Sequence, residues 1–311
     1  MSEVVNIGIC TFRRAAIVDT LQSLASQRLP ANVAMHIIVA DNDETNRQEA
    51  VIRACANRLG LTLTYLHAPA CNISIARNAC LDAATEQWFA FIDDDEIAEP
   101  DWLARLLAAR EERDVVYGVS NATYAEDAPR WIVRADLHSA RLTGNPWNGY
   151  TGNVLLRRSF INANALRFAR DLGQIGGEDT MFFLEAHLAG ARFGYAPDAI
   201  VHEPVPPGRA RFRWLALRRF RSGQIHHMVL VRQGRGRSGT VLAVLKAFWC
   251  VFGAPVHLLR QGGARPQILR GAMHFGVVAA GLGKAPYREY APPATDGSNP
   301  TVALPSSKRT G

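Results

Sequence analysis

Several signatures that would place a protein of 311 residues in a familiar class are missing from this sequence. Its five cysteines contain no CxxC pair, which disfavours a zinc knuckle and a disulfide scaffold. Neither GxGxxG nor GxxxxGK(S/T) occurs, so a Rossmann dinucleotide site and a P-loop are both disfavoured. The first residues lack the basic and then apolar stretch of a secretory signal, and we expect the chain to remain in the cytoplasm.

Acidic residues are absent from residues 204–288, although this stretch carries 15 Lys and Arg. The whole chain has a net charge of +7 and the charges after residue 288 cancel, so residues 1–203 carry 7 − 15 = −8. With 48% hydrophobic and 20% charged residues, the composition is typical of a globular protein. The charge asymmetry predicts an acidic body followed by a basic, apolar C-terminal third.

Short apolar runs alternate with segments of helical periodicity over the first 119 residues. Strands are predicted at residues 4–10, 35–40, 61–67, 88–92 and 115–119. Helices are predicted between them at residues 15–27, 48–59, 73–84 and 100–110. This alternation predicts an α/β fold with a mostly parallel sheet and helices on both faces.

After residue 120 the alternation ends. Residues 121–150 contain prolines, glycines and two tryptophans, a composition typical of a substrate loop. Further regular elements are predicted as a strand at 153–157, a helix at 178–189, one or two strands in 193–203 and a basic helix at 211–232. Apolar segments follow at 240–259 and 268–283, and the Pro/Ser/Thr-rich tail from residue 291 is expected to be disordered.

Consecutive acids stand directly after the predicted fourth strand. Asp93, Asp94, Asp95 and Glu96 would repel one another without a cation, and their hard oxygens suit Mg²⁺ or Mn²⁺, which bridge to phosphate. Asp41 ends a second strand, and ligands bind at the carboxyl ends of parallel strands. The alternative is a solvated acidic loop that caps the following helix.

A phosphate site also needs positive charge. Arg77 lies in the first turn of a predicted helix, where free N–H groups already favour anions. Thr11 and Arg13, after the first strand, add a hydroxyl and a further cation. For each arginine the alternative is a surface ion pair.

Three further residues have side chains suited to catalysis or metal binding. Glu178 and Asp179 open a predicted helix, where an acid alone more often serves as a cap. His202 ends a predicted strand and offers an imidazole ligand, although a structural histidine is the alternative.

In combination, these residues resemble the family 2 inverting glycosyltransferases of the GT-A fold, and among them the β-glucosyltransferases that assemble succinoglycan-type exopolysaccharides. The resemblance covers residues 4–221. The motifs that carry it, in chain order, are Asp41, residues 72–78, Asp93-Asp94-Asp95, Thr151-Gly152-Asn153, Glu178-Asp179 and His202.

The resemblance implies a role for each of these positions. Residues implied to hold a UDP-sugar donor are Thr11, Arg13, Asp41, Arg77, Asp93 and Asp94. Residues implied to line the acceptor site are Trp147, Gly152, Asn153 and Glu178. Asp95 and His202 would bind the Mg²⁺ or Mn²⁺ cofactor, and Asp179 would be the catalytic base.

The implied reaction is inverting transfer of a single glucose from a UDP-sugar to a polyprenyl-diphosphate-linked oligosaccharide, which forms a β-glycoside. The Gln-x-x-Arg-Trp motif of processive synthases is absent, which favours single addition. The implied organisation is a GT-A catalytic domain at 1–205, with a donor half to about 120 and an acceptor half at 121–205. A basic, helical, membrane-associating region at 206–290 and the tail at 291–311 follow.

The basic C-terminal region has a physical use at a membrane. Arginines between 209 and 221 alternate with aromatic and apolar residues, and such a segment can bind an anionic leaflet. We expect peripheral or monotopic association with the cytoplasmic face of the inner membrane, together with other exopolysaccharide assembly enzymes. The alternative is a helical subdomain packed on the sheet. No nucleic-acid partner is expected, because no recognised binding module accompanies the arginines.

Two other functions stay open at this point. A nucleotidyltransferase would make the sugar nucleotide instead of using it, but no Gly-rich, Lys-containing loop follows the first strand. A non-catalytic scaffold of polysaccharide assembly would not require Asp93, Asp95, Asp179 and His202 together.

Overall fold

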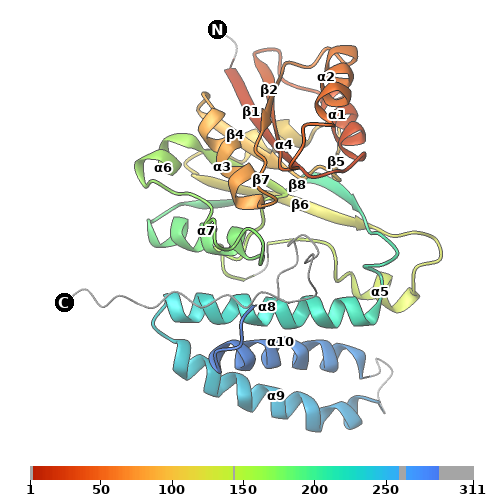
Figure 1. The fold of residues 1–311 in the computed structure, drawn as a ribbon, viewed down its shortest axis with the longest axis vertical. Coiled ribbons are helices and arrows are strands. Elements are labelled where there is room, and N and C mark those ends of the chain that lie inside the picture. The colour runs from red at the N-terminus through yellow and green to blue at the C-terminus, as the bar shows by residue number, and fades with distance from the viewer. Residues whose placement is uncertain (1–2, 143, 259–263, 287–311) are drawn as a thin grey trace. The chain divides into compact units, whose positions relative to one another are not determined.

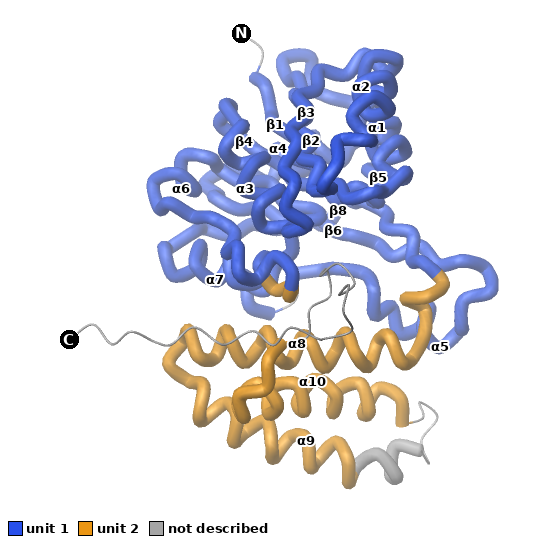
Figure 2. Tube along the Cα trace, viewed as in Figure 1, with its two compact units in different colours: residues 1–174, 178–206 blue, residues 175–177, 207–311 orange. Residues whose placement is uncertain are grey.

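The computed structural model describes residues 3–142, 144–258 and 264–286 (Figure 1). The chain divides into two compact units (Figure 2). Unit 1 comprises Met1–Gln174 and Glu178–Pro206, and unit 2 comprises Ile175–Gly177 and Pro207–Gly311.

Unit 1 is built on a mixed sheet whose strand order, over the described residues, is β3-β2-β1-β4-β7-β6-β8-β5. The strands are β1 (Glu3–Thr11), β2 (Val33–Asp41), β3 (Leu63–His67), β4 (Trp88–Ile92), β5 (Ile97–Ala98), β6 (Val115–Thr123), β7 (Asn153–Arg157) and β8 (Phe193–Pro204). β1 pairs in parallel with β2 and β4, β2 with β3, and β6 with β8. β7 runs antiparallel between β4 and β6, and β5 is antiparallel to β8.

Helices cover both faces of this sheet (Figure 1). They are α1 (Ile17–Ala25), α2 (Glu49–Arg58), α3 (Ile73–Ala83), α4 (Trp102–Ala108), α5 (Arg130–Ala135), α6 (Arg158–Ala163) and α7 (Glu178–Leu188). One buried apolar cluster joins α1, α2 and α4 to the sheet, and a second joins α3, α6 and α7 to its other face. The predicted α/β architecture is confirmed.

β4, the strand that precedes the acidic motif, lacks the alternation of apolar and polar residues that is seen in strands with one exposed face. All five residues of β4 are buried. Trp88, Ala90 and Ile92 belong to the first apolar cluster, whereas Phe89 and Phe91 belong to the second. A strand covered on both faces reads as a continuous apolar run. Of the acids that follow it, Asp94 and Glu96 are buried, whereas the side chain of Asp93 is 47% exposed.

Some elements differ from the sequence-based prediction. β6 continues to Thr123 because it pairs with β8 as far as Pro204, and α5 lies inside the segment predicted as a loop. β5 and α6 were not predicted: β5 is two residues long, and α6 is six. Such short elements carry too few residues to show a period, so pairing and packing decide them.

Unit 2 consists, in its described part, of the helices α8 (Phe212–Arg232), α9 (Gly236–Leu258) and α10 (Arg265–Gly281). α8 agrees with the predicted basic helix at 211–232. The tail predicted to be disordered, residues 291–311, lies outside the described residues. Among the described helices, none combines the length and the apolar character needed to cross a membrane.

Two glycines let α8 and α10 approach backbone to backbone. A Cβ on Gly223 would lie 1.9 Å from the carbonyl oxygen of Met273, and a Cβ on Gly276 would lie 1.9 Å from that of Phe220. Real Cβ atoms do not approach backbone oxygens this closely, so glycine is required at both positions.

The Gly276→Ala substitution is therefore expected to destabilise the protein by at least about 1–3 kcal/mol, because the new methyl group forces the helices apart. Gly271→Ala, in the same helix, is the matched control: its Cβ would meet only the Cβ of Cys250, at 3.4 Å. The control should be neutral or stabilising by up to about 1 kcal/mol, since alanine is the better helix former. Thermal denaturation followed by circular dichroism measures both, and equal midpoints would refute the close crossing.

Candidate active site

The ends of β1 and β4 meet at one edge of the sheet. The hydroxyl of Thr11 donates a hydrogen bond of 2.7 Å to Oδ2 of Asp94. The guanidinium of Arg14 lies 3.3 Å from Oδ1 of Asp94 and also forms an ion pair with Asp95. The strand-end acids are therefore joined to the first strand, as the parallel arrangement predicted, and they carry a bound cationic side chain.

Asp94 lies in an environment that opposes its ionisation. Its side chain is 8% exposed. Burial raises the pKa of Asp94 to about 7, with Asp95 and Asp93 acting in the same direction and Arg14 and Thr11 opposing. The group therefore changes charge near neutral pH in the absence of ligands.

This shift predicts a pH-dependent stability. Because the folded carboxyl of Asp94 binds its proton more tightly than the unfolded one, its contribution is complete below about pH 4 and is lost as the pH rises through about 7. Between pH 5 and pH 8 the wild type should lose about 2–3 kcal/mol relative to Asp94→Asn, which cannot titrate there. Urea unfolding of both proteins at the two pH values measures this difference, and parallel pH profiles would contradict it.

Glu96, the last acid of the motif, is buried and hydrogen-bonded within the protein. Its Oε1 accepts a hydrogen bond of 2.8 Å from Ser120, and its Oε2 accepts one of 3.0 Å from the backbone N–H of Asp93. Burial, followed by the nearby Asp93 charge, raises the pKa of Glu96 well above its usual range. A Cβ on Gly152 would lie 2.9 Å from Glu96 Oε1 and 3.0 Å from Asp93 Oδ2, so Gly152, which was predicted to line the acceptor site, packs against these acids.

A buried ion pair connects the acidic loop to α7. Arg77 of α3 pairs with Glu178, and the two side chains are 9% and 7% exposed. Nη2 of Arg77 also lies 3.9 Å from Oδ1 of Asp93, whose side chain is 47% exposed. Burial acts to lower the pKa of Arg77, but Glu178, Asp93 and Asp179 more than offset it and raise that pKa. Arg77 therefore holds together the two acidic motifs that the sequence treats separately.

Asp179 faces the same region. Its Oδ1 accepts a 2.6 Å hydrogen bond from the backbone N–H of Thr180, and the described residues provide no hydrogen bond to Oδ2. Tyr117, a residue that the sequence did not single out, has a pKa raised mainly by burial and next by the Asp179 charge. Within the described part of the chain, the Tyr117 hydroxyl and Oε2 of Glu178 are buried without hydrogen-bond partners. These polar atoms, together with the half-buried carboxylate of Asp179, are suited to receive a hydroxyl-bearing ligand.

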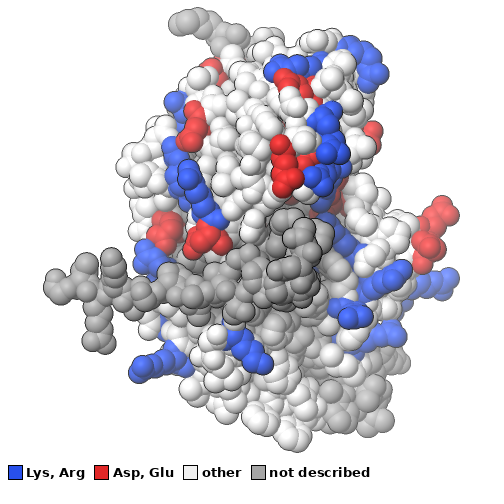
Figure 3. Space-filling view, in the orientation of Figure 1, with Lys and Arg blue, Asp and Glu red and all other residues white. Residues whose placement is uncertain are grey.

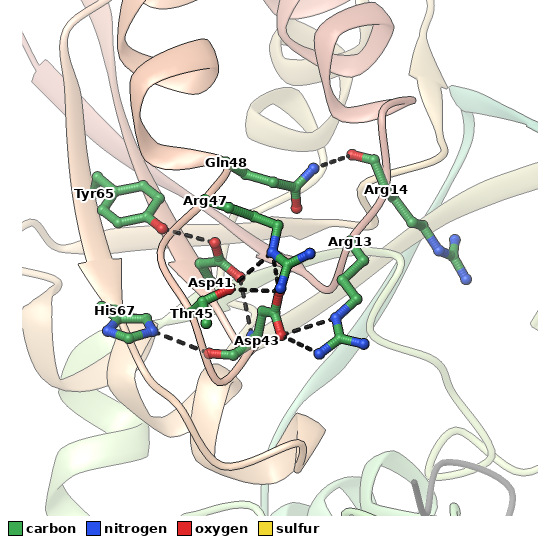
Figure 4. A network of polar contacts seen from close by, with 9 residues as sticks. All are labelled: Arg13, Arg14, Asp41, Asp43, Thr45, Arg47, Gln48, Tyr65 and His67. Atoms are coloured by element: carbon green, nitrogen blue, oxygen red, sulfur yellow. Dashed lines mark hydrogen bonds and ion pairs between the residues drawn. The ribbon is translucent and has the colours of Figure 1, made fainter. Parts of the chain in front are cut away.

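A second polar network lies at the end of β2 (Figure 4). Asp41 is fully buried; its Oδ2 accepts a 2.7 Å hydrogen bond from Tyr65, and its Oδ1 accepts one of 3.0 Å from the N–H of Asp43. Arg13 donates two hydrogen bonds, of 2.8 and 2.7 Å, to Oδ1 of Asp43. In this conformation a ligand reaches Asp41 only if the covering side chains move.

Figure 4 also shows the neighbouring arginines diverging: Arg13 points into the network, and the side chain of Arg14 turns away from it. Arg13 adopts a left-handed backbone with φ of 56°, which is uncommon for a residue other than glycine. This turn sends Arg14 to the acids of β4, a partnership that adjacency in sequence did not reveal.

The side chain of Asn153, which was predicted to line the acceptor site, is buried and forms hydrogen bonds within the protein. It is fully buried, and its Oδ1 accepts a 2.9 Å hydrogen bond from the indole of Trp102. Its Nδ2 donates to the carbonyl oxygens of Val119 and Ala199. In this conformation Asn153 joins β7 to its neighbours and contributes no free polar atom to a ligand. Trp147 lies in the turn region before β7 and is partly exposed.

His202, predicted as a metal ligand with Asp95, contacts a different acid. Its Nε2 lies 3.1 Å from Oε1 of Glu99, in the region where β8 pairs with β5. Among the described residues, no three or more His, Cys, Asp or Glu side chains are grouped as a metal site. The structure therefore does not assemble Asp95 and His202 into a complete metal site, although Asp95 does hold a cationic group.

A mixed sheet with helices on both faces and acids at the end of a central strand is the arrangement expected of the GT-A fold. The chain belongs to glycosyl transferase family 2, whose model matches residues 6–167, and it is therefore an enzyme. This confirms the family resemblance and excludes the nucleotidyltransferase alternative.

Two curated relatives illustrate this membership. The chain is 40% identical over 294 residues to the succinoglycan biosynthesis protein ExoM of Rhizobium meliloti, with 92% of this chain and 95% of ExoM covered. It is 26% identical to the glucosyl-dolichyl phosphate glucuronosyltransferase of Haloferax volcanii, covering 70% of this chain and 75% of that protein.

Solved structures share the fold. The mannosyltransferase PcManGT of Pyrobaculum calidifontis, in complex with GDP-Man and Mn²⁺, matches with a TM-score of 0.61 at 17% identity, covering 89% of this chain and 86% of its own. S. aureus TarS 1–349, in complex with UDP-GlcNAc, matches with a TM-score of 0.52 at 15% identity, covering 88% and 90%. At these identities the likeness establishes the fold alone.

Proposed function

We propose that this enzyme transfers a single glucose from a UDP-sugar to a polyprenyl-diphosphate-linked oligosaccharide during assembly of an exopolysaccharide repeat unit of the succinoglycan type. The observation that carries this proposal is the 40% identity with a succinoglycan biosynthesis protein over nearly the whole of both chains. The site supports it in two ways. The carboxylates that follow β4 are suited to a donor, and Asp179, with the unpaired Oε2 of Glu178 and the unpaired hydroxyl of Tyr117 among the described residues, is suited to a sugar hydroxyl.

The proposed chemistry assigns the central step to Asp179. Its carboxylate takes the proton of the acceptor hydroxyl as the hydroxyl oxygen attacks the anomeric carbon. A carbon–oxygen bond forms to the acceptor, and the bond to the nucleoside diphosphate breaks, with the electron pair leaving on phosphate oxygen. Attack from the opposite side inverts the configuration, so an α-linked donor yields a β-glycoside.

The other site residues bind and orient in this proposal. Asp93 and Asp94 would contact the donor ribose and sugar, while Thr11, Arg13 and Asp41 would hold the nucleotide. Arg77, whose Nη2 lies 3.9 Å from Oδ1 of Asp93, would contribute positive charge near the diphosphate. Gly152 lets the substrate approach the acids, because a side chain there would displace Asp93 and Glu96.

A divalent cation fits this site in part. Asp95 is a suitable ligand, since its carboxylate already binds the guanidinium of Arg14 and hard oxygens prefer Mg²⁺ or Mn²⁺. When bound, such a cation would offset the negative charge of the leaving diphosphate. The predicted second ligand, His202, would have to leave Glu99, so we propose Asp95 as the protein ligand that matters most.

The proposed cellular location of the enzyme follows from the nature of its proposed acceptor. A polyprenyl carrier is confined to a bilayer, and the region 206–290 combines positive charge with apolar residues. We therefore propose that unit 1 carries catalysis and that unit 2 attaches the enzyme, peripherally or monotopically, to the cytoplasmic face of an anionic membrane, beside other assembly enzymes.

Calorimetric titration of the full chain with UDP, first with Mn²⁺ and then with EDTA, tests the donor site. Binding should require the metal and should fall by at least about tenfold in Asp95→Ala, because a charged ligand to the metal is lost. Asp198→Ala is the control, since that carboxylate is 76% exposed on β8. Absence of UDP binding under both conditions, or full binding by Asp95→Ala, would overturn the proposed donor site.

A further inference from the structure

One side of α9 exposes large apolar side chains in an unbroken band. Trp249 and Phe252 are 75% and 72% exposed. At 100° per residue the band spans an arc of about 120° on the helix, and Val251, which is 50% exposed, lies beyond one margin of it. We call this band the α9 outer face; it consists of Val241, Leu242, Leu245, Phe248, Trp249 and Phe252.

The opposite side of α9 already accounts for its packing within unit 2. Ala243, Ala247 and Cys250 are nearly fully buried. Ala243 belongs to one cluster with Leu230 of α8 and Val277 of α10. The three-helix packing therefore uses small side chains, and the large ones of the α9 outer face are not needed for it. Contiguous exposed apolar surface of this kind marks an interaction site.

The charge around this face selects the partner. Residues 204–288 carry 15 Lys and Arg and no Asp or Glu, and on the drawn face of α8, α9 and α10 the coloured charges are those of Lys and Arg (Figure 3). Lys246 and Arg237 are exposed on α9 itself. A second copy of this chain would bring an equally positive surface against the first, so self-association is disfavoured, whereas an anionic surface is attracted.

We propose that the α9 outer face inserts into the headgroup boundary of an anionic bilayer, with α9 lying in the plane of the membrane. Because the other side of the helix is packed on α8 and α10, only one side is available to lipid. Tryptophan, phenylalanine and leucine on one side with basic residues nearby is the pattern of an interfacial helix. This deepens the membrane partner of the proposed function and rests on it for the choice of a bilayer.

The proposal places the membrane contact on α9 and not on the segment that the sequence pointed to. In residues 209–221, Leu215 is 1% exposed and Arg221 is 8% exposed, with Nη2 of Arg221 donating to the carbonyl oxygen of Ile175. Part of that segment is therefore interior. Both sides of α9 are apolar. Its sequence therefore shows no helical period that would distinguish the packed side from the exposed side.

Co-sedimentation of the full chain with vesicles of 30% phosphatidylglycerol and 70% phosphatidylcholine tests the proposal without donor or acceptor. Leu245→Ser/Trp249→Ser/Phe252→Ser should lower the partition coefficient by about tenfold or more, because exposed apolar contacts are removed from the interface. Val51→Ser/Leu188→Ser, which removes apolar residues 57% and 52% exposed in unit 1, is the control and should bind as the wild type does. Vesicles of phosphatidylcholine alone should bind more weakly.

Quenching by brominated lipids locates the contact. Tryptophan fluorescence of the wild type should be quenched on vesicle binding, and most of that quenching should disappear in Trp249→Phe, which keeps the face apolar. Undiminished vesicle binding by the triple serine variant would overturn the proposal, as would equal binding to neutral vesicles. A wild type that ignores vesicles but is a dimer, with a monomeric triple variant, would assign the face to self-association.

The UDP titration separates this inference from the proposed function. A triple serine variant that loses vesicle binding but keeps UDP binding supports both. Vesicle binding by a wild type that fails to bind UDP would sustain the membrane face and overturn the donor site.

Discussion

Replacing Asp179 by asparagine is expected to lower the turnover number of sugar transfer by about 10²–10⁴-fold, the usual contribution of a general base. UDP affinity should change little, because Asp179 faces the region of Glu178 and Tyr117 and takes no part in the Thr11–Asp94 contact. Transfer of radiolabelled sugar from UDP-glucose to lipid extracts, paired with UDP calorimetry, measures the two effects separately.

Asp198→Asn removes an equal charge from an exposed position and should leave transfer unchanged. If Asp179→Asn retains wild-type turnover, another group takes the proton and the proposed role of Asp179 fails. If UDP affinity falls together with turnover, the residue acts on the donor instead.

Replacing Arg77 by methionine is expected to cost about 3–5 kcal/mol of folding stability, because it leaves the buried Glu178 carboxylate without its partner. Burial already raises the pKa of Glu178, with Arg77 opposing, so loss of Arg77 raises it further. A buried carboxyl with a raised pKa binds a proton more tightly when folded. The destabilisation should therefore be smaller below about pH 5 and larger at pH 8.

The double variant Arg77→Met/Glu178→Gln provides the decisive comparison. With both charges removed it should recover much of the lost stability, since the penalty arises from an unpaired buried charge. Urea unfolding of the wild type, both single variants and the double variant completes the cycle. A double variant no more stable than Arg77→Met would show that the arginine acts through packing, for example over the Phe168 ring, where its guanidinium lies 5.5 Å from the centroid.

Much of the fold was predictable because its longer elements are visible in the sequence, either as a helical period or as a continuous apolar run. β1, β2, β3 and β4 lie within two residues of the predicted strands, as continuous apolar runs bounded by polar residues. The antiparallel insertion of β7 between β4 and β6 was not predictable, because strand direction is decided by pairing. β5 exists only because Ile97 and Ala98 meet β8.

The candidate site divides in the same way. The sequence was sufficient to single out Asp93, Asp94 and Asp95, since consecutive acids directly after a buried strand are visible in the order of residues. Their roles in the site stay predictions. It could not say that Arg14, and not Arg13, reaches them, because one left-handed residue reverses which side chain points to the acids.

Other pairings depended on contacts between residues far apart in the chain. The partnership of Arg77 with Glu178 spans 101 residues, and the burial of Asn153 depends on Trp102 and two backbone carbonyl oxygens. Tyr117 is part of a buried strand, and nothing in a run of apolar residues distinguishes a tyrosine whose pKa is raised by the charge of Asp179.

By itself, the sequence determined the class of fold, the acids at the strand ends and the positive charge of the C-terminal third, because these follow from residue type, period and order. The tertiary structure alone decided which charges form ion pairs and which predicted site residues are buried and hydrogen-bonded inside the protein. It also decided which side of α9 is exposed. The physical reason is that ion pairing and burial depend on distances across the fold, and a linear pattern contains no such distances.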